Sequence, residues 1–436
     1  MEEGLKVRTT ALNTKDHEGN AKVHEEKSLP LIRPFAGLRP LPRYAAEVAA
    51  PPYDVLSSDE ARERARGNPN SFLHVSKAEI DLPAGTDSHG DAVYRKAREN
   101  FDRLIREGVL VRDASPCFYV YRLTLGAHRQ TGLVGAASVA AYDDGRIKRH
   151  ELTRPDKEDD RVRHMEALNA QTGPVLMAYP SQPEIDALLA SACTSPPSID
   201  VLADAGVRHE LWVIADEGIC QRLQAAFESL PALYIADGHH RSAAASRVAA
   251  SRRGSHGTDS HCYFLVVAFP HHETRILDYN RVVSDLNGMS AELFIERVRA
   301  KFEVQPSGQA VKPEARGEFG LYVAGRWYRL RAHSAHVPKD PVARLDVSVL
   351  SDQILAPLLD IRDLRLDERV DFVGGIRGVS ELQRRVDSGA AAAAFSVFPT
   401  SMEDLMAVSD AGQIMPPKST WFEPKLADGL VSHLLD

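Results

Sequence analysis

Short apolar stretches alternate with amphipathic stretches along most of the chain. In the first kind, apolar residues run together or alternate singly with polar ones, as in β-strands; in the second they recur every three or four positions, as in α-helices. The predicted strands lie at 117–125, 131–142, 175–179, 208–214, 233–236 and 261–269. The clearest predicted helices lie at 92–108, 184–193 and 346–361. Strands interleaved with helices in this way indicate an α+β fold with a mixed α/β core.

The stretch at 233–250 predicts a strand, a tight turn and a helix in immediate succession. Four apolar residues end at Ala236, and an alanine-rich run without proline follows the turn. Asp237 stands where a side chain can cap the helix. We therefore expect a strand that ends directly at the N-terminus of a helix.

The first turn of that helix has an unusual charge. Its unpaired amides already carry about half a positive charge, and His239, His240 and Arg241 would add to it. A bound anion would remove this conflict, and Gly238 has no side chain to obstruct its approach. We therefore predict that Gly238, His239, His240 and Arg241 bind the phosphates of a nucleotide. The alternative is an ordinary Asp-capped surface helix with neutral histidines.

A second charged segment precedes and begins the helix expected from about residue 154. Thr153 followed by Pro155 and Asp156 is a helix-start pattern. Beyond it, Lys157 and Arg161 lie four residues apart, on one face of the helix. Such a face is commonly a solvated, salt-bridged surface. The alternative, which we favour, is that the segment forms part of an active site, because His150 and Glu151 stand just before it.

Three regions are expected. Residues 1–32 read as a disordered polar tail, residues 33–286 as the core, and residues 287–436 as a C-terminal α+β domain that packs on the core. Within them, the run at 72–75 is expected to be a strand, and the pair at 324–325 to be a hairpin turn.

Composition narrows the function classes. The chain has 436 residues and a formal net charge of -8, which argues against a nonspecific nucleic-acid binder. Its 4 cysteines form no C-x-x-C pair, so neither a zinc ribbon nor a disulfide framework is indicated. The first thirty residues lack the apolar core of a secretory signal, and no apolar run is long enough to cross a bilayer. We expect a cytoplasmic protein without a membrane or nucleic-acid partner; its oligomeric state is left open.

Near the C-terminal end, Lys418 and Ser419 suggest the end of a P-loop, but prolines replace the glycine that should precede the lysine. A Walker site is therefore rejected. Both residues can still contact a nucleotide or an acidic substrate, and a basic surface loop is an equally good interpretation.

Several motifs carry a family resemblance. The segment DGHHRSAAA resembles the phosphate box of the ParB-like fold, which sulfiredoxin and the archaeal free serine kinases share in variant form. The order of PPYDV, NPNSFLHV, HELTRPDKEDDR, IADGHHR and MPPKSTWFEPKL is similar to that of a large bacterial family of uncharacterised proteins related to those kinases. The resemblance implies a ParB/sulfiredoxin-like nucleotide-binding core. It also implies transfer of a phosphoryl group from ATP or ADP to a hydroxyl, with free L-serine as acceptor and O-phosphoserine as product.

Phosphoryl transfer needs neutralised phosphate oxygens, an aligned acceptor and usually Mg²⁺. Glu151 is the expected general base, with His150 and Asp237 as further catalytic groups. Asp156 or Asp237 is the expected Mg²⁺ ligand. Further contacts to phosphate or to the amino-acid substrate are expected from Lys157, Arg161, Lys418 and Ser419. Two alternatives remain open: a ParB-like nucleotide-binding regulator, and a phosphatase or other hydrolase that uses the same anion site.

Overall fold

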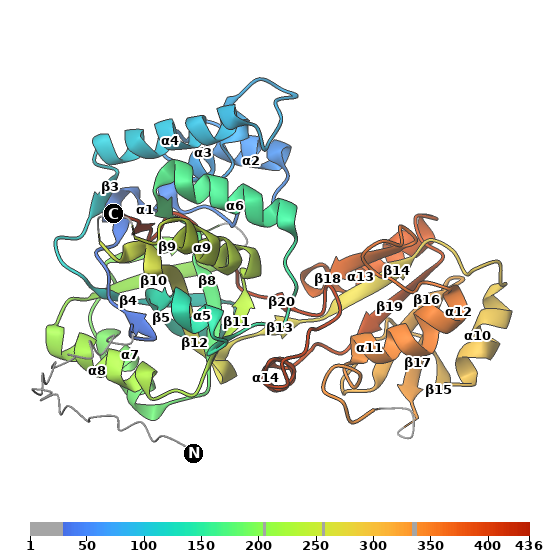
Figure 1. Ribbon diagram of the computed structural model, residues 1–436. Helices are drawn as coiled ribbons and strands as arrows, with labels where there is room; N and C mark the ends of the chain where they lie inside the picture. The colour runs from blue at the N-terminus through green and yellow to red at the C-terminus, as the bar shows by residue number, and fades with distance from the viewer. Residues whose placement is uncertain (1–28, 204–205, 255–257, 334–337) are drawn as a thin grey trace, which may run out of the picture.

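The computed structural model describes residues 29–203, 206–254, 258–333 and 338–436. It has two lobes, each built on one large β-sheet (Figure 1). We call the lobe with the nine-stranded sheet the first lobe and the lobe with the six-stranded sheet the second lobe. The mixed α/β architecture agrees with the predicted fold class.

The sheet of the first lobe has the order β6-β11-β8-β12-β5-β4-β10-β9, with β1 added beside β5. Most neighbours are antiparallel, while β12 with β8 and β11 with β6 are parallel pairs. In chain order, the strands are β1 Ile32–Arg33, β4 Phe118–Leu125, β5 His128–Ser138, β6 Ile147–Lys148, β8 Val175–Tyr179, β9 Ile199–Leu202, β10 Val207–Ile214, β11 Leu233–Asp237 and β12 Tyr263–Pro270.

Helices cover the first sheet. These are α5 Val139–Asp143, α6 Pro155–Leu168, α7 Pro183–Ala192, α8 Glu217–Glu228 and α9 His239–Ser251. The N-terminal part of the chain adds α1 Ala45–Val48, α2 Ser58–Ala65, α3 Leu73–Ser76 and α4 Asp91–Arg106, and α4 packs on α6. α6 packs in turn on α9, so the two helices that begin with charged residues lie side by side (Figure 1).

The central strands are apolar on both faces because both faces are buried. Along β11, Leu233 and Ile235 belong to the core beneath α5, α7, α8 and α9, whereas Tyr234 and Ala236 point to the opposite face. Successive side chains of a strand point to opposite faces, so a continuous apolar run is expected for a strand covered on both sides. The core on the second face continues into the second lobe.

The second lobe has the antiparallel order β15-β17-β16-β19-β14-β18. Its strands are β14 Tyr279–Val283, β15 Phe302–Ser307, β16 Glu318–Val323, β17 Arg326–Ala332, β18 Val370–Gly374 and β19 Ala393–Val397. Its helices are α10 Ala291–Arg299, α11 Asp346–Leu350, α12 Ala356–Leu359, α13 Gly378–Asp387 and α14 Met402–Asp410. The predicted hairpin turn between β16 and β17 is present, with positive φ at Ala324 and Gly325.

Short strand pairs join distant parts of the chain. β13 Ile276–Leu277 pairs with β20 Trp421–Phe422 between the lobes, and β21 His433–Leu434 pairs with β7 Ala170–Gln171 in the first lobe. A further pair joins β2 Leu38–Pro40 to β3 Leu110–Arg112. The last residues of the chain therefore return to the first lobe (Figure 1).

Three expectations differ from this arrangement. The strand predicted at 131–142 ends at Ser138, where the Ser138 side chain caps the helix α5. The run at 72–75 lies in and just before the helix α3, because Phe72 and Val75, three residues apart, both turn into the core; a run this short does not distinguish a strand from a buried helical turn. The lobes also do not divide at 287: β14 pairs in the second sheet before that position, and the chain after β20 packs in the first lobe.

Among the helices in the described part of the chain, none is both long and apolar enough to span a membrane.

Candidate active site

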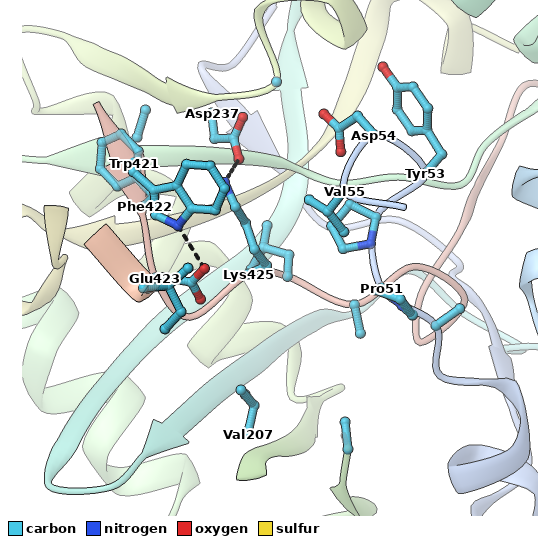
Figure 2. Close-up of a pocket in the computed structure, with 18 of the residues that line it drawn as sticks. Pro51, Tyr53, Asp54, Val55, Val207, Asp237, Trp421, Phe422, Glu423 and Lys425 are labelled. Carbon is cyan, nitrogen blue, oxygen red and sulfur yellow. Dashed lines mark hydrogen bonds and ion pairs between the residues drawn. The ribbon is translucent and has the colours of Figure 1, made fainter. Parts of the chain in front are cut away.

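A cavity of about 810 Å³ lies where the two lobes meet, at the N-terminal end of α9. Figure 2 shows part of its wall, formed by segments far apart in the sequence. The lining includes Tyr53 and Asp54 from the N-terminal part, His150 and Glu151 before α6, residues 236–241 at the β11–α9 junction, Tyr279 and Arg377 from the second lobe, and residues 418–427. The cavity thus joins the segments that carried the sequence motifs.

The β11–α9 junction has the backbone that a close approach requires. Gly238 is the N-cap of α9, with φ of 100° in the left-handed region that favours glycine, and no side chain caps the helix there. The expectation that Asp237 caps α9 is therefore wrong. Its carboxylate lies 3.0 Å from the Lys425 ammonium instead, as Figure 2 shows. The unpaired amides of the first turn are left available to an anion.

The charge of Asp237 is fixed by its neighbours. Burial alone would raise the pKa of its carboxyl group, but Lys425 and Arg241 outweigh this effect and hold the pKa below its ordinary value. Asp237 is therefore ionised. The cavity wall therefore carries a negative charge at Asp237 next to the positive charges of Lys425 and Arg241.

Arg241 is held rigidly against the helix start. A Cβ atom at Gly238 would lie 3.1 Å from the Arg241 Nε atom, so the guanidinium packs directly on the glycine. One of its amino groups donates to the backbone oxygen of Pro174. Burial raises the pKa of the Asp428 carboxyl to about 7, although Arg241 beside it opposes this. Arg241 thus stands at the cavity wall with part of its hydrogen-bonding capacity committed.

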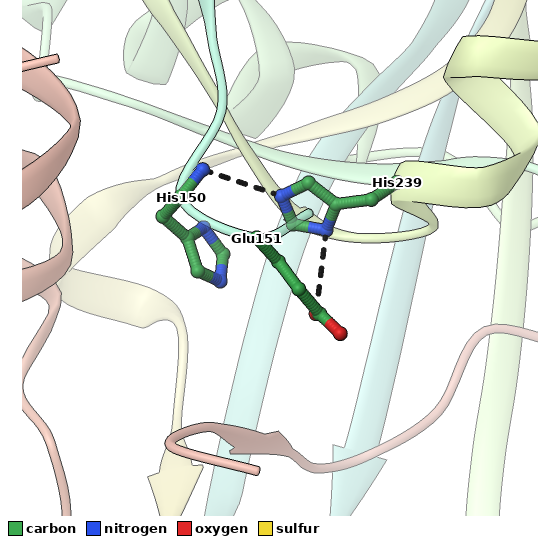
Figure 3. A group of neighbouring side chains, drawn as sticks. All are labelled: His150, Glu151 and His239. Carbon is green, nitrogen blue, oxygen red and sulfur yellow. Dashed lines mark hydrogen bonds and ion pairs between the residues drawn. The ribbon is translucent and has the colours of Figure 1, made fainter. Parts of the chain in front are cut away.

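His150, Glu151 and His239 meet on the same wall (Figure 3). The Nδ1 atom of His239 lies 3.8 Å from a Glu151 carboxylate oxygen, and its Nε2 atom accepts a hydrogen bond of 3.5 Å from the His150 backbone N–H. The two imidazoles lie edge to face, with ring centres 4.5 Å apart. The segment before α6 and the start of α9, predicted separately, therefore lie in contact.

The protonation states of this group follow from desolvation. Burial lowers the pKa of His150 to about 4, and burial followed by repulsion from His150 lowers the pKa of His239. Desolvation raises the pKa of Glu151, against the nearby Lys418. Both imidazoles are thus neutral at pH 7, and the carboxylate is more basic than an ordinary glutamate.

His240 connects α9 to the other charged helix. Its Nε2 atom accepts a hydrogen bond of 3.1 Å from the backbone N–H of Arg154, which is the N-cap of α6. The predicted cap at Thr153 is wrong, because the Thr153 hydroxyl donates to the Glu158 carboxylate instead. Pro155 does occupy the first turn of the helix, as predicted.

Three residues of α6 that were expected to bind phosphate, substrate or Mg²⁺ lie outside the cavity lining. Asp156, Lys157 and Arg161 are not among the described residues that line the cavity. Asp156 is exposed and accepts hydrogen bonds of 2.8 and 3.2 Å from Arg154. Arg161 is buried, pairs with Asp160 and lies 3.8 Å over the Tyr53 ring, so it supports a cavity residue from behind. The alternative of a solvated face therefore fails for Arg161.

The predicted C-terminal residues do line the cavity. Lys418 is exposed, and its backbone oxygen accepts a 3.1 Å hydrogen bond from the buried Arg281. The hydroxyl of Ser419 is committed to the Pro416 oxygen at 2.7 Å. The Lys418 ammonium lies 5.8 Å from the centre of the Tyr279 ring at the cavity, whereas Ser419 shapes the loop.

Two residues in or beside the cavity had no role assigned from the sequence. Asp428 lies near Arg241, and Trp421, which lines the cavity, donates to Glu423 at 2.9 Å (Figure 2). Trp421 belongs to the MPPKSTWFEPKL motif, so the motif pointed to its segment. Asp428 carried no signal, since a single acidic residue after a motif is ordinary.

Comparison with known proteins gives one family. A family model described as "Protein of unknown function (DUF1015)" matches residues 32–348. No curated protein matches the chain.

The chain is similar to several solved structures. One is a mutant free serine kinase in complex with ADP, with 13% sequence identity and a TM-score of 0.33; the match covers 66% of this chain and 86% of that chain. Another is SbnI with C-terminal truncation from Staphylococcus aureus, at 12% identity and a TM-score of 0.35, covering 68% and 85%. A conserved hypothetical protein from Pyrococcus furiosus has 14% identity and a TM-score of 0.32, covering 69% and 94%. TM-scores this low do not establish the ParB/sulfiredoxin-like core.

Proposed function

This chain belongs to the DUF1015 family, and from that premise we propose that it is a nucleotide-dependent small-molecule kinase, which transfers a phosphoryl group to an acceptor hydroxyl. The observation that carries the proposal is the helix start at the cavity: α9 begins without a side-chain cap, at a glycine with positive φ, next to Arg241. Backbone N–H groups and a guanidinium at a helix N-terminus are a well-suited phosphate site.

The cavity supports the proposal by its contents. Its volume of about 810 Å³ is within the range of small-molecule sites. The cations Lys418 and Lys425 and the carboxylates Glu151 and Asp237 all line the cavity, and Lys425 lies 3.0 Å from the Asp237 carboxylate next to the start of α9. Phosphoryl transfer is catalysed chiefly by positioning and by charge stabilisation, which is what such a set of groups provides.

In the proposed reaction, Glu151 accepts the proton of the acceptor hydroxyl while the hydroxyl oxygen bonds to the terminal phosphorus of the nucleotide. The bond from that phosphorus to the bridging oxygen breaks, and the nucleotide leaves with one phosphate fewer. Desolvation raises the pKa of Glu151, which makes it a better base. Gly238, His239, His240 and Arg241 are the proposed phosphate-binding residues, and His150 supports the base from behind.

Magnesium has suitable ligands in the cavity, because Asp54 and Asp237 offer the hard oxygen atoms that Mg²⁺ prefers. When bound with a nucleotide, Mg²⁺ neutralises phosphate oxygens. Asp156, the other ligand expected from the sequence, is exposed and paired with Arg154, so we assign Asp237.

The acceptor is proposed from the motif resemblance. The resemblance to the free serine kinases suggests L-serine as acceptor, O-phosphoserine as product, and ATP or ADP as donor. Lys418 is the proposed contact for the acceptor carboxylate.

The test is a phosphorus NMR assay of the full chain with L-serine, Mg²⁺ and either ATP or ADP. We expect a phosphoserine signal that grows as the nucleotide is consumed. Glu151→Gln should lose at least about 100-fold in rate, since general bases contribute about that much, while ADP binding by calorimetry stays unchanged. The matched control is Glu217→Gln, in the exposed first turn of α8, away from the cavity lining.

Nucleotide binding without turnover would instead support a regulatory role. Release of phosphate from a monoester without nucleotide would support a hydrolase. Full activity of Glu151→Gln would show that Glu151 is not the general base.

A further inference from the structure

The group of His150, Glu151 and His239 is a metal-ligand set in itself. Each residue offers one ligand atom, and the three atoms lie within 4.8 Å of one another. The residues come from two elements held in contact, since the His150 backbone N–H donates to the His239 ring (Figure 3). No sequence motif had joined them, because 88 residues separate Glu151 from His239.

His150 itself gives a second, independent indication that a ligand binds here. Its side chain is 1% exposed, and within the described residues neither ring nitrogen makes a hydrogen bond of ordinary geometry, although the Ile235 backbone interacts weakly with the ring. Leaving a buried polar group without a partner is unfavourable. A ligand at the face of the cavity would supply the missing partner. The ring lies beside His239 and Glu151, so the ligand would meet all three at once.

The rings are in the state that ligation needs. Burial lowers the pKa of both imidazoles, so both are neutral at pH 7 and present lone pairs. In the metal-free arrangement, the Nε2 atom of His239 accepts a hydrogen bond, so its proton sits on Nδ1, facing Glu151. Ligation through Nδ1 would move that proton to Nε2 and so replace the 3.5 Å hydrogen bond from the His150 N–H group, which is already at the limit of hydrogen-bond length.

We propose that His150, His239 and Glu151 bind one divalent transition-metal ion, for which Zn²⁺ is the representative, in preference to Mg²⁺. Two imidazole nitrogens and one carboxylate oxygen suit zinc and its neighbours, whereas magnesium takes oxygen ligands and water. Three protein ligands leave a fourth position open toward the cavity.

Binding requires the ligand atoms to close slightly. Ligands at about 2.1 Å from a tetrahedral metal ion lie about 3.4 Å apart, so a separation of 4.8 Å has to shrink by about 1.4 Å. Glu151 can supply this movement, because its side chain is about half exposed and stands in the loop before α6. A carboxylate that ligates through one oxygen keeps a second oxygen for the proposed proton transfer.

The metal site does not depend on the proposed kinase function, because the three residues would bind metal in the absence of nucleotide. The test is isothermal titration of the full chain, prepared without a polyhistidine tag, with Zn²⁺ and separately with Mg²⁺. We expect one equivalent of Zn²⁺ and no heat of binding with Mg²⁺ alone. Co²⁺ should bind with the same stoichiometry and give the visible absorption bands of a tetrahedral site.

Variants identify the ligands. Glu151→Gln and His239→Asn should each weaken Zn²⁺ binding by more than about 10-fold, since even residues behind the ligands contribute 10- to 100-fold. Their thermal midpoints without metal establish that they fold. The matched control is His272→Ala, which removes an exposed histidine from another histidine pair, beside His271.

Three outcomes would overturn the proposal: no stoichiometric Zn²⁺ binding by the parent protein, equal binding by the parent and Glu151→Gln, or a loss in His272→Ala as large as in His239→Asn. None of these results bears on whether the cavity binds a nucleotide.

Discussion

Two neighbouring helices of the first lobe begin with charged residues, and only one of them begins in a binding cavity. α6 begins at an exposed turn, with Pro155 in the first turn and Asp156 and Glu158 to compensate the helix dipole. α9 begins in a buried turn with no acidic residue and no side-chain cap. A helix start whose dipole is compensated by acidic residues of its own first turn needs no ligand, whereas one without a side-chain cap or an acidic residue in that turn can receive an anion. The predictions below test this difference, beginning with the largest expected effect.

The largest difference between the two helix starts is expected when the arginine at each is replaced and ADP affinity is measured. Arg241→Ala should weaken ADP binding by about 10- to 100-fold, because a hydrogen bond to a charged group contributes about 1.5–3 kcal/mol. Arg154→Ala, at the N-cap of α6, should leave the affinity unchanged, because the side chain pairs with the exposed Asp156 and the contact with His240 is made by the backbone, which the substitution keeps. Calorimetric titration with ADP measures both. Equal affinities for the two variants would contradict a phosphate site at α9.

The buried imidazole beside α9 should make the protein sensitive to acid. The pKa of His150 is about 4 in the folded protein and about 6.5 in the unfolded chain, so the unfolded chain binds protons more readily. Stability is therefore lost as the pH falls from about 6.5 and stops falling near pH 4. At pH 5 the loss due to this residue is about 2 kcal/mol. The groups facing it are His239, Glu151 and Asp237.

Urea unfolding at pH 7 and pH 5 measures this effect. His150→Phe should lose about 2 kcal/mol less than the parent protein between the two values, whatever its stability at pH 7. His272→Phe, with an exposed ring, is the control. A loss in His150→Phe as large as in the parent would show that His150 is not the acid-sensitive group.

The glycine at the start of α9 should be less replaceable than other glycines with positive φ. Gly238→Ala forces a Cβ atom to within 3.1 Å of the Arg241 guanidinium, in addition to the backbone cost. Gly145→Ala, with φ of 84° and open space around its Cα, carries the backbone cost alone, about 1 kcal/mol. We expect Gly238→Ala to lose more than its control in chemical unfolding, and to weaken ADP binding as well. Identical losses would mean that Arg241 moves aside freely.

The smallest effect is expected at the start of α6. Asp156→Asn should shift the thermal midpoint slightly, because one favourable charge at an exposed helix start is lost. It should leave Mg²⁺-dependent nucleotide binding intact. A loss of Mg²⁺ dependence would restore Asp156 as a metal ligand.

The comparison also explains what the sequence could predict. The charge conflict at His239 to Arg241 and the motif around Glu151 are local patterns, and both segments line the cavity. The pairing of Asp237 with Lys425 depends on contacts between residues 188 positions apart. A pattern of neighbouring residues carries no information about a contact over this distance. From the local sequence alone, an aspartate just before a helix is expected to cap it.

Burial was the other unpredictable quantity. Arg161 and Lys157 share one face of a helix in sequence, yet Arg161 is buried against Tyr53 and Lys157 is not. The cause is the packing of α4 and the N-terminal loop onto α6. The strand order of the mixed sheet and the lobe boundary likewise depend on long-range pairing, as β14 and β21 illustrate.

The return of the chain to the first lobe sets the order in which the cavity can be completed. Lys418, Trp421 and Lys425 follow both sheets in the chain, and they line the cavity. During synthesis both lobes can acquire their sheets while the α9 helix start still faces solvent. A ribosome-bound chain that stops before residue 415 should therefore have folded lobes and no ligand affinity.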